Sequence, residues 1–512
     1  MTPQVPLRLA STAGDLPELE QALLKMTGSN LTGRTTVTST YYDTASGRLN
    51  HDGLALQVRE QNGQHTQIVA TTDAKGEPSL APREWVDVIP GERPDLGAPN
   101  SSVHLPEAIS PAELRARFTT TVQRTLWMLE PDSSTEILGA VDKGQIRTVE
   151  GERTEPIYEI ELQLKLKRGD PTALYGTGLQ LLEIAPLRIE LRSKPEHGCR
   201  LLEGTTAKPP AQHSLSFDLK PDMTVEESLR KIGLAGLRLF LRNELAALAG
   251  VSDGIHQMRV AVRRLRSAVT TMKRMLPHEQ YLWVSQELRW LANILAAARN
   301  WDVLSSSLLA PLKIALPNDQ DLTELCRICE RERQSAYQSA VAAIRSRQYT
   351  AALLKLSLWF ASSSWRNQPI SQQSALLMAP IGTVASSLIG CRYKKVQKAA
   401  NRFDELTPQQ RHEFRIAVKK LRYTIEFLKD LFDSNHVASF VQGLKPLQDD
   451  AGYANDVRVA HELLTDLQLS RDAVPVARAA GVVLGWHDRG LTDLDLKLRK
   501  HVRRLRQLRP FW

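Results

Sequence analysis

The chain has 512 residues, enough for two or more domains that each bury a core. Hydrophobic residues make up 42% and charged residues 24%, as in globular proteins, and no apolar run approaches the roughly 20 residues of a membrane span. The four cysteines argue against a disulfide scaffold, and the start MTPQVPLRLA lacks the pattern of a secretory signal. We therefore expect a cytoplasmic protein with no membrane partner.

The net charge of +9 is unevenly distributed. Residues 1–210 hold 22 Lys and Arg against 28 Asp and Glu, so the rest of the chain holds 44 basic against 29 acidic groups. The excess positive charge therefore lies in the C-terminal part. Such a field attracts polyanions in general, and by itself it does not separate polyphosphate from nucleic acid or anionic lipid.

Residues 1–205 predict a strand-rich domain. Short alternating or β-branched segments recur between turns, at 35–43, 53–60, 66–72, 83–89, 135–144, 158–170 and 188–194. Two segments rich in helix formers, 15–26 and 111–122, predict helices inserted among the strands. The polar, proline-bearing residues 206–222 predict a linker, and residues 223–512 have a helical pattern.

One segment of the helical part occurs twice, as HQMRVAVRRLRSAV and HEFRIAVKKLRYTI. Four polar residues recur in a 3-4-3 spacing and pair as His256 with His412, Arg259 with Arg415, Arg263 with Lys419, and Arg266 with Arg422. Spacings of three and four place all four on one face of a helix, and apolar residues lie between them. Each copy therefore predicts an amphipathic helix that packs by one stripe and presents cations on the other.

A single row of cations on a helix is commonly a solvated face. Two matched rows favour an anion-binding surface, because cations within two helical turns repel one another unless an anion or an acidic partner neutralises them. Arg offers paired hydrogen bonds to phosphate oxygens, and Lys offers a point charge. We find no base-reading motif, so nucleic acid is the less favoured polyanion.

Together with ARNWDVL and LQDDAGYANDV, the repeated segments resemble the CHAD family over about residues 220–512. The resemblance implies an all-α domain of two pseudo-symmetric four-helix bundles that binds inorganic polyphosphate in a basic cleft between its halves. The phosphate ligands it implies are His256, Arg259, Arg263, Arg264, Arg266, His412, Arg415, Lys419, Lys420 and Arg422. Lys394 and Lys395 are further candidates, with a solvated helix face as the equal alternative. Asp302 and Asp456 are expected to orient basic side chains.

A second resemblance, over about residues 4–203, is to the CYTH family. It is carried by YYDTASGRLNHDGLALQVRE, FTTTVQRTLW, YEIELQLKLKRGD and RSKPEHGCRLL. It implies a triphosphate tunnel metalloenzyme fold, in which eight antiparallel strands close into a barrel and alternate residues face inward. The basic residues it implies as triphosphate ligands are Arg59, Arg83, Arg124, Lys165, Arg192 and Lys194. Glu159 and Glu161 would hold Mg²⁺ or Mn²⁺, unless they belong to the exposed polar face of an amphipathic strand.

Several positions depart from the CYTH pattern. Where that family's first strand carries Glu-x-Glu-x-Lys, this chain has Gln4, Pro6 and Arg8, and Gln163 stands where a later Glu is usual. The Lys expected after TQIV is also absent. Fewer carboxylates weaken the hold on a metal that neutralises charge in phosphoryl transfer. We therefore predict a catalytically weakened tunnel that still binds triphosphate.

The whole chain is thus expected to be a multi-domain α+β protein that binds inorganic polyphosphate in the cytoplasm, including polyphosphate granules. The alternative is an active metal-dependent inorganic triphosphatase that its helical domain recruits to polyphosphate. Cys326 and Cys329 have no second pair nearby to complete a zinc site, and two half-buried thiols are the favoured interpretation.

Overall fold

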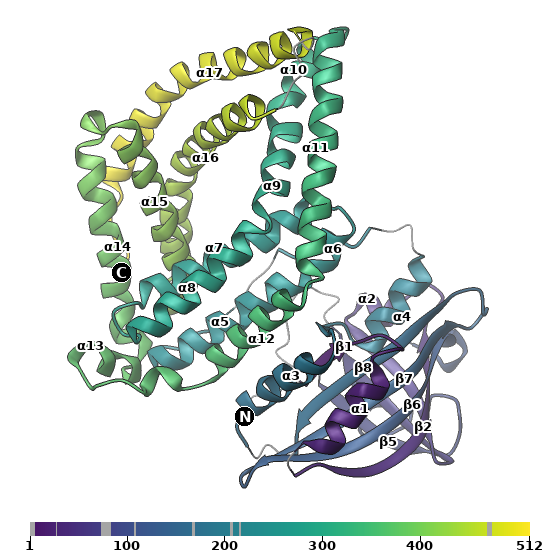
Figure 1. Cartoon of the computed structure of the whole chain (residues 1–512). Coiled ribbons are helices and arrows are strands. Elements are labelled where there is room, and N and C mark those ends of the chain that lie inside the picture. Colours follow the sequence, from purple (N-terminus) through teal and green to yellow (C-terminus); the bar gives the residue numbers. More distant parts are fainter. Residues whose placement is uncertain are drawn as a thin grey trace. The chain divides into compact units, whose positions relative to one another are not determined.

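The computed structural model describes residues 6–26, 28–72, 83–106, 109–165, 169–204, 208–213, 217–467 and 474–512. The chain divides into two compact units, shown in Figure 1. One comprises Met1–Ser216 with Arg345–Ser362, and the other Phe217–Ile344 with Ser363–Trp512. None of the described helices is both long and apolar enough to cross a bilayer. Gln4, one of the departures from the CYTH pattern, lies outside the described residues.

The N-terminal unit is built on an antiparallel sheet whose nine described strands follow the order β5-β4-β3-β2-β6-β7-β8-β1-β9. Their bounds are β1 Leu7–Ala10, β2 Asn30–Asp43, β3 Leu54–Gln61, β4 Gln64–Thr71, β5 Glu84–Ile89, β6 Arg115–Asp132, β7 Thr135–Thr148, β8 Thr154–Leu164 and β9 Arg188–Ile189. β9 has only two residues, which leaves eight longer strands. The expected antiparallel sheet, followed by a helical region, is confirmed.

Alternation along the strands gives the sheet two different faces. Leu9 of β1 and Ile160 of β8 belong to a hydrophobic core that α1 (Leu16–Lys25) and α3 (Thr172–Ile184) cover. Arg8, next to Leu9 in β1, lies on the opposite face because successive strand residues point to opposite sides. The apolar residues of these strands therefore build the core, and their neighbours build a polar face.

α4 (Lys194–Glu203) packs on β6 and β7. Its Leu201 joins a second core with Phe118 of β6. The approach is so close at Gly198 that a Cβ atom would lie 2.0 Å from Cε2 of Phe118. Ser193 and Glu196 form a capping box that starts the helix, and this fixes Lys194 in the first turn.

Two predictions for this unit were wrong in detail. Only Pro111–Glu113 of the expected helix at 111–122 is helical, as a short 3-10 turn, and Arg115 begins the long strand β6. The β-branched run that follows Phe118 suits a strand paired on both sides better than a helix. The strand expected at 188–194 ends after β9, where the capping box begins α4. The short helix α2 (Arg48–His51) was not expected.

The helical unit contains two sets of four helices, visible in Figure 1. The first consists of α5 (Val225–Arg242), α7 (Ser252–Thr271), α8 (His278–Asn293) with its continuation α9 (Ala296–Val303), and α11 (Gln320–Ile344). The second consists of α14 (Ile381–Asn401), α15 (Pro408–Leu428), α16 (Ser434–Thr465) and α17 (Val474–Gln507). Shorter pieces are α6 (Glu244–Leu248), α10 (Leu309–Ala315) and α13 (Gln372–Ala375). α12 (Arg347–Ala361) groups with the N-terminal unit, where Leu354 joins the core beneath α3.

The two sets correspond in order and in position. Their first helices, α5 and α14, start side by side, with backbone hydrogen bonds from Val225 to Ala379 at 3.0 Å and from Ile381 to Met223 at 2.7 Å. Their second helices, α7 and α15, carry the repeated segments and pack against each other. Each of these two helices buries the apolar stripe that the sequence predicted, including Val262 in α7. The pseudo-symmetry therefore brings the two rows of cations to one place.

Candidate functional sites

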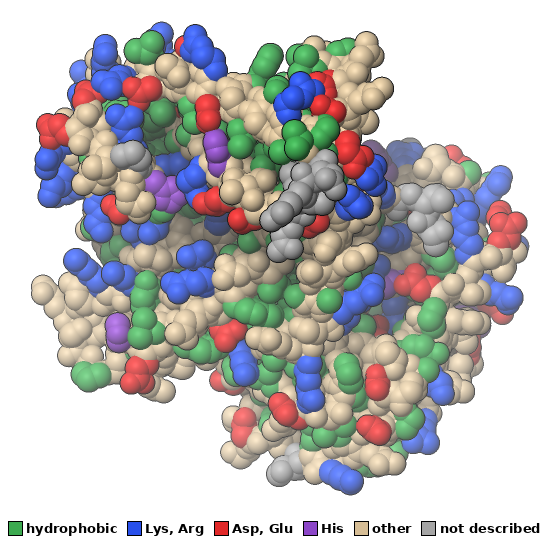
Figure 2. Space-filling view, turned by 45° about the horizontal axis from the view of Figure 1, so that its top comes forward, with side chains coloured by type: hydrophobic (Ala, Val, Ile, Leu, Met, Phe, Trp, Pro, Cys, Tyr) green, Lys and Arg blue, Asp and Glu red, His purple; other side chains and the backbone are tan. Residues whose placement is uncertain are grey.

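A pocket of about 470 Å³ lies among α7, α9, α15 and α16. Basic side chains from both copies of the repeat line it, together with one from α9. These are His256, Arg259, Arg263, Arg266, Arg299, Arg415, Lys419 and Lys420. All four polar residues of the first copy and two of the second, Arg415 and Lys419, thus face one cavity. Figure 2 shows Lys and Arg side chains gathered on the face of the helical unit that is turned to the viewer.

As far as the described residues show, few acidic groups lie near the Arg and Lys side chains of this pocket. Within the described residues, none of the seven forms an ion pair, and Asp456 is the one carboxylate among the lining residues. Arg259 and Arg415 occupy equivalent positions, and each donates from Nη1 to a backbone carbonyl, at 3.1 Å in both cases. In the part of the chain that the structure describes, the buried Nε atoms of Arg259, Arg263 and Arg415 have no hydrogen-bond partner. Many donors therefore stay available to an anion.

Burial and the like charges gathered in this pocket shift the pKa values of two of its side chains. Burial, with the nearby Arg299 and Arg263, lowers the pKa of His256 to about 4, so that this imidazole is neutral at pH 7. Burial, with Arg415 and Arg263, lowers the pKa of Lys419 to about 8. An anion in the pocket would reverse both effects, because it would favour the charged form of each group.

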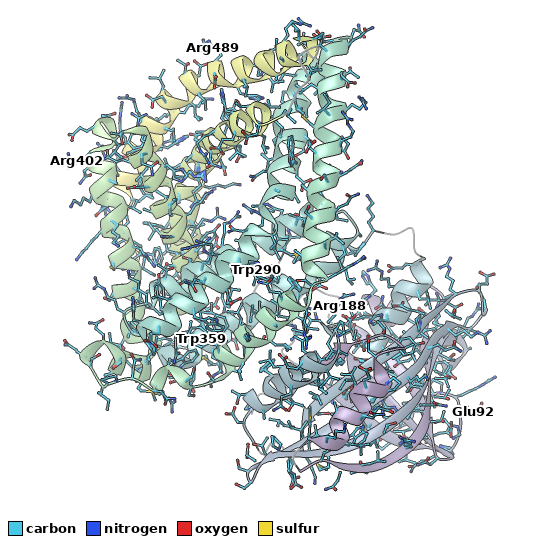
Figure 3. All side chains as sticks on the ribbon, viewed as in Figure 1. Glu92, Arg188, Trp290, Trp359, Arg402 and Arg489 are labelled. Carbon is cyan, nitrogen blue, oxygen red and sulfur yellow. The ribbon has the colours of Figure 1, made fainter. Side chains whose placement is uncertain are left out.

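Three of the residues predicted from the repeat, and the further candidate Lys394, lie elsewhere. Arg264 and Arg422 both contact Glu426, with nitrogen–oxygen distances of 3.3 Å and 2.7 Å. His412 lines a separate cavity, and Lys394 is exposed on α14. Charge by itself therefore does not mark the site. Arg402 and Arg489, labelled in Figure 3, are exposed cations at the rim of the helical unit. They pair with Glu405 and Asp493 and lie outside the pocket.

The sequence analysis missed one cation of the pocket, Arg299, and a second cation, Arg392, lies near the pocket in the same basic segment of α14 as the candidates Lys394 and Lys395. Arg299, in α9, belongs to the segment ARNWDVL, in which the sequence analysis named only Asp302 as a candidate. Arg392 donates to Oγ1 of Thr271 at 3.0 Å. Burial, followed by the charges of Arg392, Arg266 and Lys395, lowers the pKa of Lys420. The positive field thus extends from the pocket toward α14, where Lys395 is exposed.

The two aspartates expected to have one role differ. Asp302 is buried and accepts hydrogen bonds from Tyr337 at 2.7 Å and from Arg333 at 3.2 Å. Asp456 lines the cation pocket, and burial raises its pKa despite the nearby Arg415. Asp302 therefore attaches α11 to α9 through Tyr337 and Arg333, whereas Asp456 places one carboxyl group among the cations of the pocket.

The polar face of the N-terminal sheet gathers three cations and three carboxylates: Arg8, Arg124, Lys194, Asp142, Glu159 and Glu161. Asp142 is 1% exposed and accepts hydrogen bonds from Arg124, at 2.7 Å from both Nε and Nη2, and from Lys194 at 2.8 Å. Burial alone would raise the pKa of Asp142, but the hydrogen bonds from Arg124 and the charge of Lys194 outweigh it and lower the pKa to about 2. Asp142 was not predicted from the sequence.

The two glutamates proposed as metal ligands also face cations. Glu159 lies 3.2 Å from Lys194 and 3.8 Å from Arg8, and Glu161 lies 3.9 Å from Arg8. Among the described residues, no group of three or more His, Cys, Asp or Glu side chains is arranged to hold a metal ion. Mg²⁺ and Mn²⁺ take carboxylate oxygens that are free to approach them, so they do not fit this set of residues in its present pairing. The three positive and three negative charges neutralise one another instead.

The remaining residues predicted for the tunnel are dispersed. Arg192 forms paired hydrogen bonds with Glu190, at 3.1 Å and 2.8 Å. Lys165 pairs with Glu136 at 2.8 Å, and Arg83 is exposed. Among the described residues, the buried Nε atom of Arg59 has no hydrogen-bond partner.

Comparison with known families agrees with both resemblances. Residues 7–187 match the model of the CYTH domain, and residues 232–465 match that of the CHAD domain. The chain therefore carries a CYTH domain followed by a CHAD domain. Two proteins from two strains of Mycobacterium tuberculosis, described as uncharacterized, are 31% and 30% identical to it over 196 residues. Those matches cover 35% of this chain and 35% of each relative, so the chain spans about a third of the curated relatives' length.

Solved structures are similar to each unit. The CHAD domain of the plant Ricinus communis is 28% identical, with a TM-score of 0.49, and the match covers 58% of this chain and 97% of that one. A protein of Hippeastrum, described as a putative adenylyl cyclase with a dominant triphosphatase activity, is 16% identical, with a TM-score of 0.29. That match covers 41% of this chain and 100% of the other. Each is a similarity to another protein and assigns no activity to this one.

Proposed function

We propose that the helical unit binds inorganic polyphosphate in the pocket between α7 and α15. The observation that carries this proposal is the set of seven Arg and Lys side chains that line one cavity and form no ion pair within the described residues. Cations this close repel one another, so a ligand with closely spaced negative charges stabilises them collectively. The Arg forks suit phosphoryl oxygens.

The N-terminal unit is a weaker anion site in this proposal. Its cations Arg8, Arg124 and Lys194 are engaged by carboxylates, so triphosphate or the end of a polyphosphate chain must displace those partners before it binds. Arg59 supplies the first available donor. The helical unit would thus hold the polymer in the cytoplasm and at polyphosphate granules, and the N-terminal unit would engage chain ends.

Calorimetric titration of the full chain with long-chain polyphosphate tests the proposal. Arg263→Glu and Lys419→Glu should each weaken binding at least tenfold, because they place a carboxylate in the pocket. Arg402→Glu and Arg489→Glu change the net charge equally but alter exposed side chains outside the pocket, and they should leave binding within about twofold. Equal losses in all four variants would mean that only the overall charge matters, and the pocket would be the wrong site.

The CYTH match favours a second candidate, a metal-dependent inorganic triphosphatase. Phosphate release from tripolyphosphate, measured with Mg²⁺ or Mn²⁺ by a malachite-green assay, separates the two. We expect little turnover, because Glu159 and Glu161 face Arg8 and Lys194 rather than forming an open metal site. Robust turnover that Glu161→Gln abolishes would establish the enzyme instead.

A further inference from the structure

A second cavity, of about 550 Å³, lies among α15, α16, α17 and the turn that precedes α15. Its walls are mainly apolar and include Phe403, Phe414, Val418, Leu447, Leu494 and Leu498. The cavity is partly open to solvent, so a ligand can enter it from the surface. Its volume lies within the range of small-molecule binding sites, which typically combine apolar walls with a few polar groups.

Most of the ionisable groups of this cavity are basic. Arg411, His412, Arg415 and Arg458 line it together with the carboxylate of Asp495. Arg411 pairs with Asp495 at 2.6 Å, and Arg458 pairs with Glu462. Arg415 forms no ion pair within the described residues, and the buried Nε atoms of both Arg411 and Arg415 have no hydrogen-bond partner. Burial, followed by the charges of Arg415 and Arg458, lowers the pKa of His412.

We infer that this cavity binds an amphiphilic anion, with an aliphatic chain among the apolar walls and a carboxylate or phosphate head at Arg415. A neutral apolar molecule would leave the buried donors of Arg411 and Arg415 without partners, which is costly in an apolar environment. Polyphosphate has no apolar surface to offer the walls. A chain with one anionic end satisfies both parts of the cavity.

The amphiphile site adjoins the cation pocket, because Arg415 and Asn455 line both cavities. A head group at Arg415 would neutralise one of the seven cations available to polyphosphate. Binding of the two ligands should therefore be mutually antagonistic, with the same coupling factor in both directions. This consequence rests on the proposed polyphosphate binding, whereas the amphiphile site itself does not.

Calorimetry of the full chain with ligands that share a twelve-carbon chain tests the site. We expect dodecanoate and dodecyl phosphate, below their micelle-forming concentrations, to bind at one site at least tenfold more tightly than dodecanol. A preference between the two anions identifies the head group. No saturable binding, or equal binding of dodecanol, overturns the inference.

Two variants reduce the volume of the cavity from opposite walls, Ala454→Phe on α16 and Leu498→Trp on α17. Each should weaken dodecanoate binding at least tenfold, and Ala438→Phe, at an exposed position on α16, should not. Circular dichroism shows whether each variant is folded, and two independent filling variants keep the test valid if one unfolds. Undiminished binding in a folded filling variant contradicts the assignment. If dodecanoate binds while polyphosphate does not, the proposed function fails and this inference stands.

Discussion

Lys419 and Arg263 occupy equivalent positions in the two copies of the repeat, but only the lysine can lose its charge near neutral pH. Its pKa is about 8 in the protein alone, below the ordinary lysine value, because burial and Arg415 disfavour the charged form. Polyphosphate favours the charged form and should raise this pKa. We therefore expect proton uptake on binding at pH 8.5 and tighter binding as the pH falls from 9 to 7.

Calorimetry in buffers of different ionisation enthalpy measures the uptake. Lys419→Arg keeps the positive charge at all these pH values and should remove most of the uptake while retaining binding. His256, whose pKa is about 4, contributes only at lower pH, where the complex would favour its protonation. The same uptake in Lys419→Arg and in the unaltered chain would show that another group titrates.

Adjacent arginines in α7 should behave differently. Arg263 lines the cation pocket and forms no ion pair among the described residues, whereas Arg264 contacts Glu426. Arg263→Gln should therefore weaken polyphosphate binding by roughly tenfold or more, the worth of a charge-assisted hydrogen bond. Arg264→Gln should leave affinity within about twofold and lower unfolding stability by at most about 1 kcal/mol. Comparable affinity losses in the two variants would contradict the geometry.

At the scale of helices, one irregular segment depends on a distant side chain. The π-helical turn Leu304–Leu308 connects α9 to α10, and His487 of α17 donates from Nε2 to the carbonyl oxygen of Leu308 at 2.8 Å. Its Nδ1 accepts from the hydroxyl of Tyr453 at 2.7 Å, and the imidazole is 3% exposed. His487→Leu should lower unfolding stability by about 1–3 kcal/mol, because buried polar groups lose their partners.

Urea denaturation followed by circular dichroism checks this value for the transition of the helical unit. His461→Leu is the matched control, since His461 pairs with Asp488 on the surface and should cost at most about 1 kcal/mol. A loss at His487 no larger than at His461 would mean that the π-helical turn does not depend on α17.

The sequence predicted which residues share one face of a helix better than it predicted the ion-pair partners of those residues. Spacing within one helix correctly placed Arg259 and Arg263 on a common face, because that face depends only on local geometry. The same spacing could not exclude Arg264, whose acidic partner comes from another helix. For Arg422 the signal was present, since Glu426 follows four residues later, a spacing that favours an ion pair.

The N-terminal unit shows the same limit more strongly. Alternation predicted that Glu159 and Glu161 share a face, which the pairing of β8 with β1 agrees with. Their partners, Arg8 of β1 and Lys194 of α4, are more than 30 residues away in the chain, and no local pattern pairs them. The tertiary fold thus decides whether these carboxylates bind a metal ion or pair with basic side chains.

At the scale of the whole molecule, the two units differ in whether the cations of their candidate sites are paired with carboxylates. The N-terminal unit neutralises Arg8, Arg124 and Lys194 with its own carboxylates, whereas the helical unit leaves seven cations unpaired in one pocket within its described residues. Polyphosphate that binds there must release condensed counterions, so affinity should depend steeply on salt. With about 0.7 counterions released per neutralised phosphate of a flexible chain, seven contacts predict a log–log slope of roughly −5.

This slope predicts that the binding constant falls about a thousandfold between 50 and 200 mM salt. The double variant Arg263→Gln with Lys419→Gln removes two contacts and should reduce the slope by about 1.4, whereas Arg402→Gln with Arg489→Gln should leave it unchanged, because those side chains already pair with Glu405 and Asp493. Fluorescence anisotropy of end-labelled polyphosphate over a salt series gives both slopes. A slope near −1 for the unaltered chain would limit the contact to one or two phosphates, and the seven cations could not then act together as a polymer site.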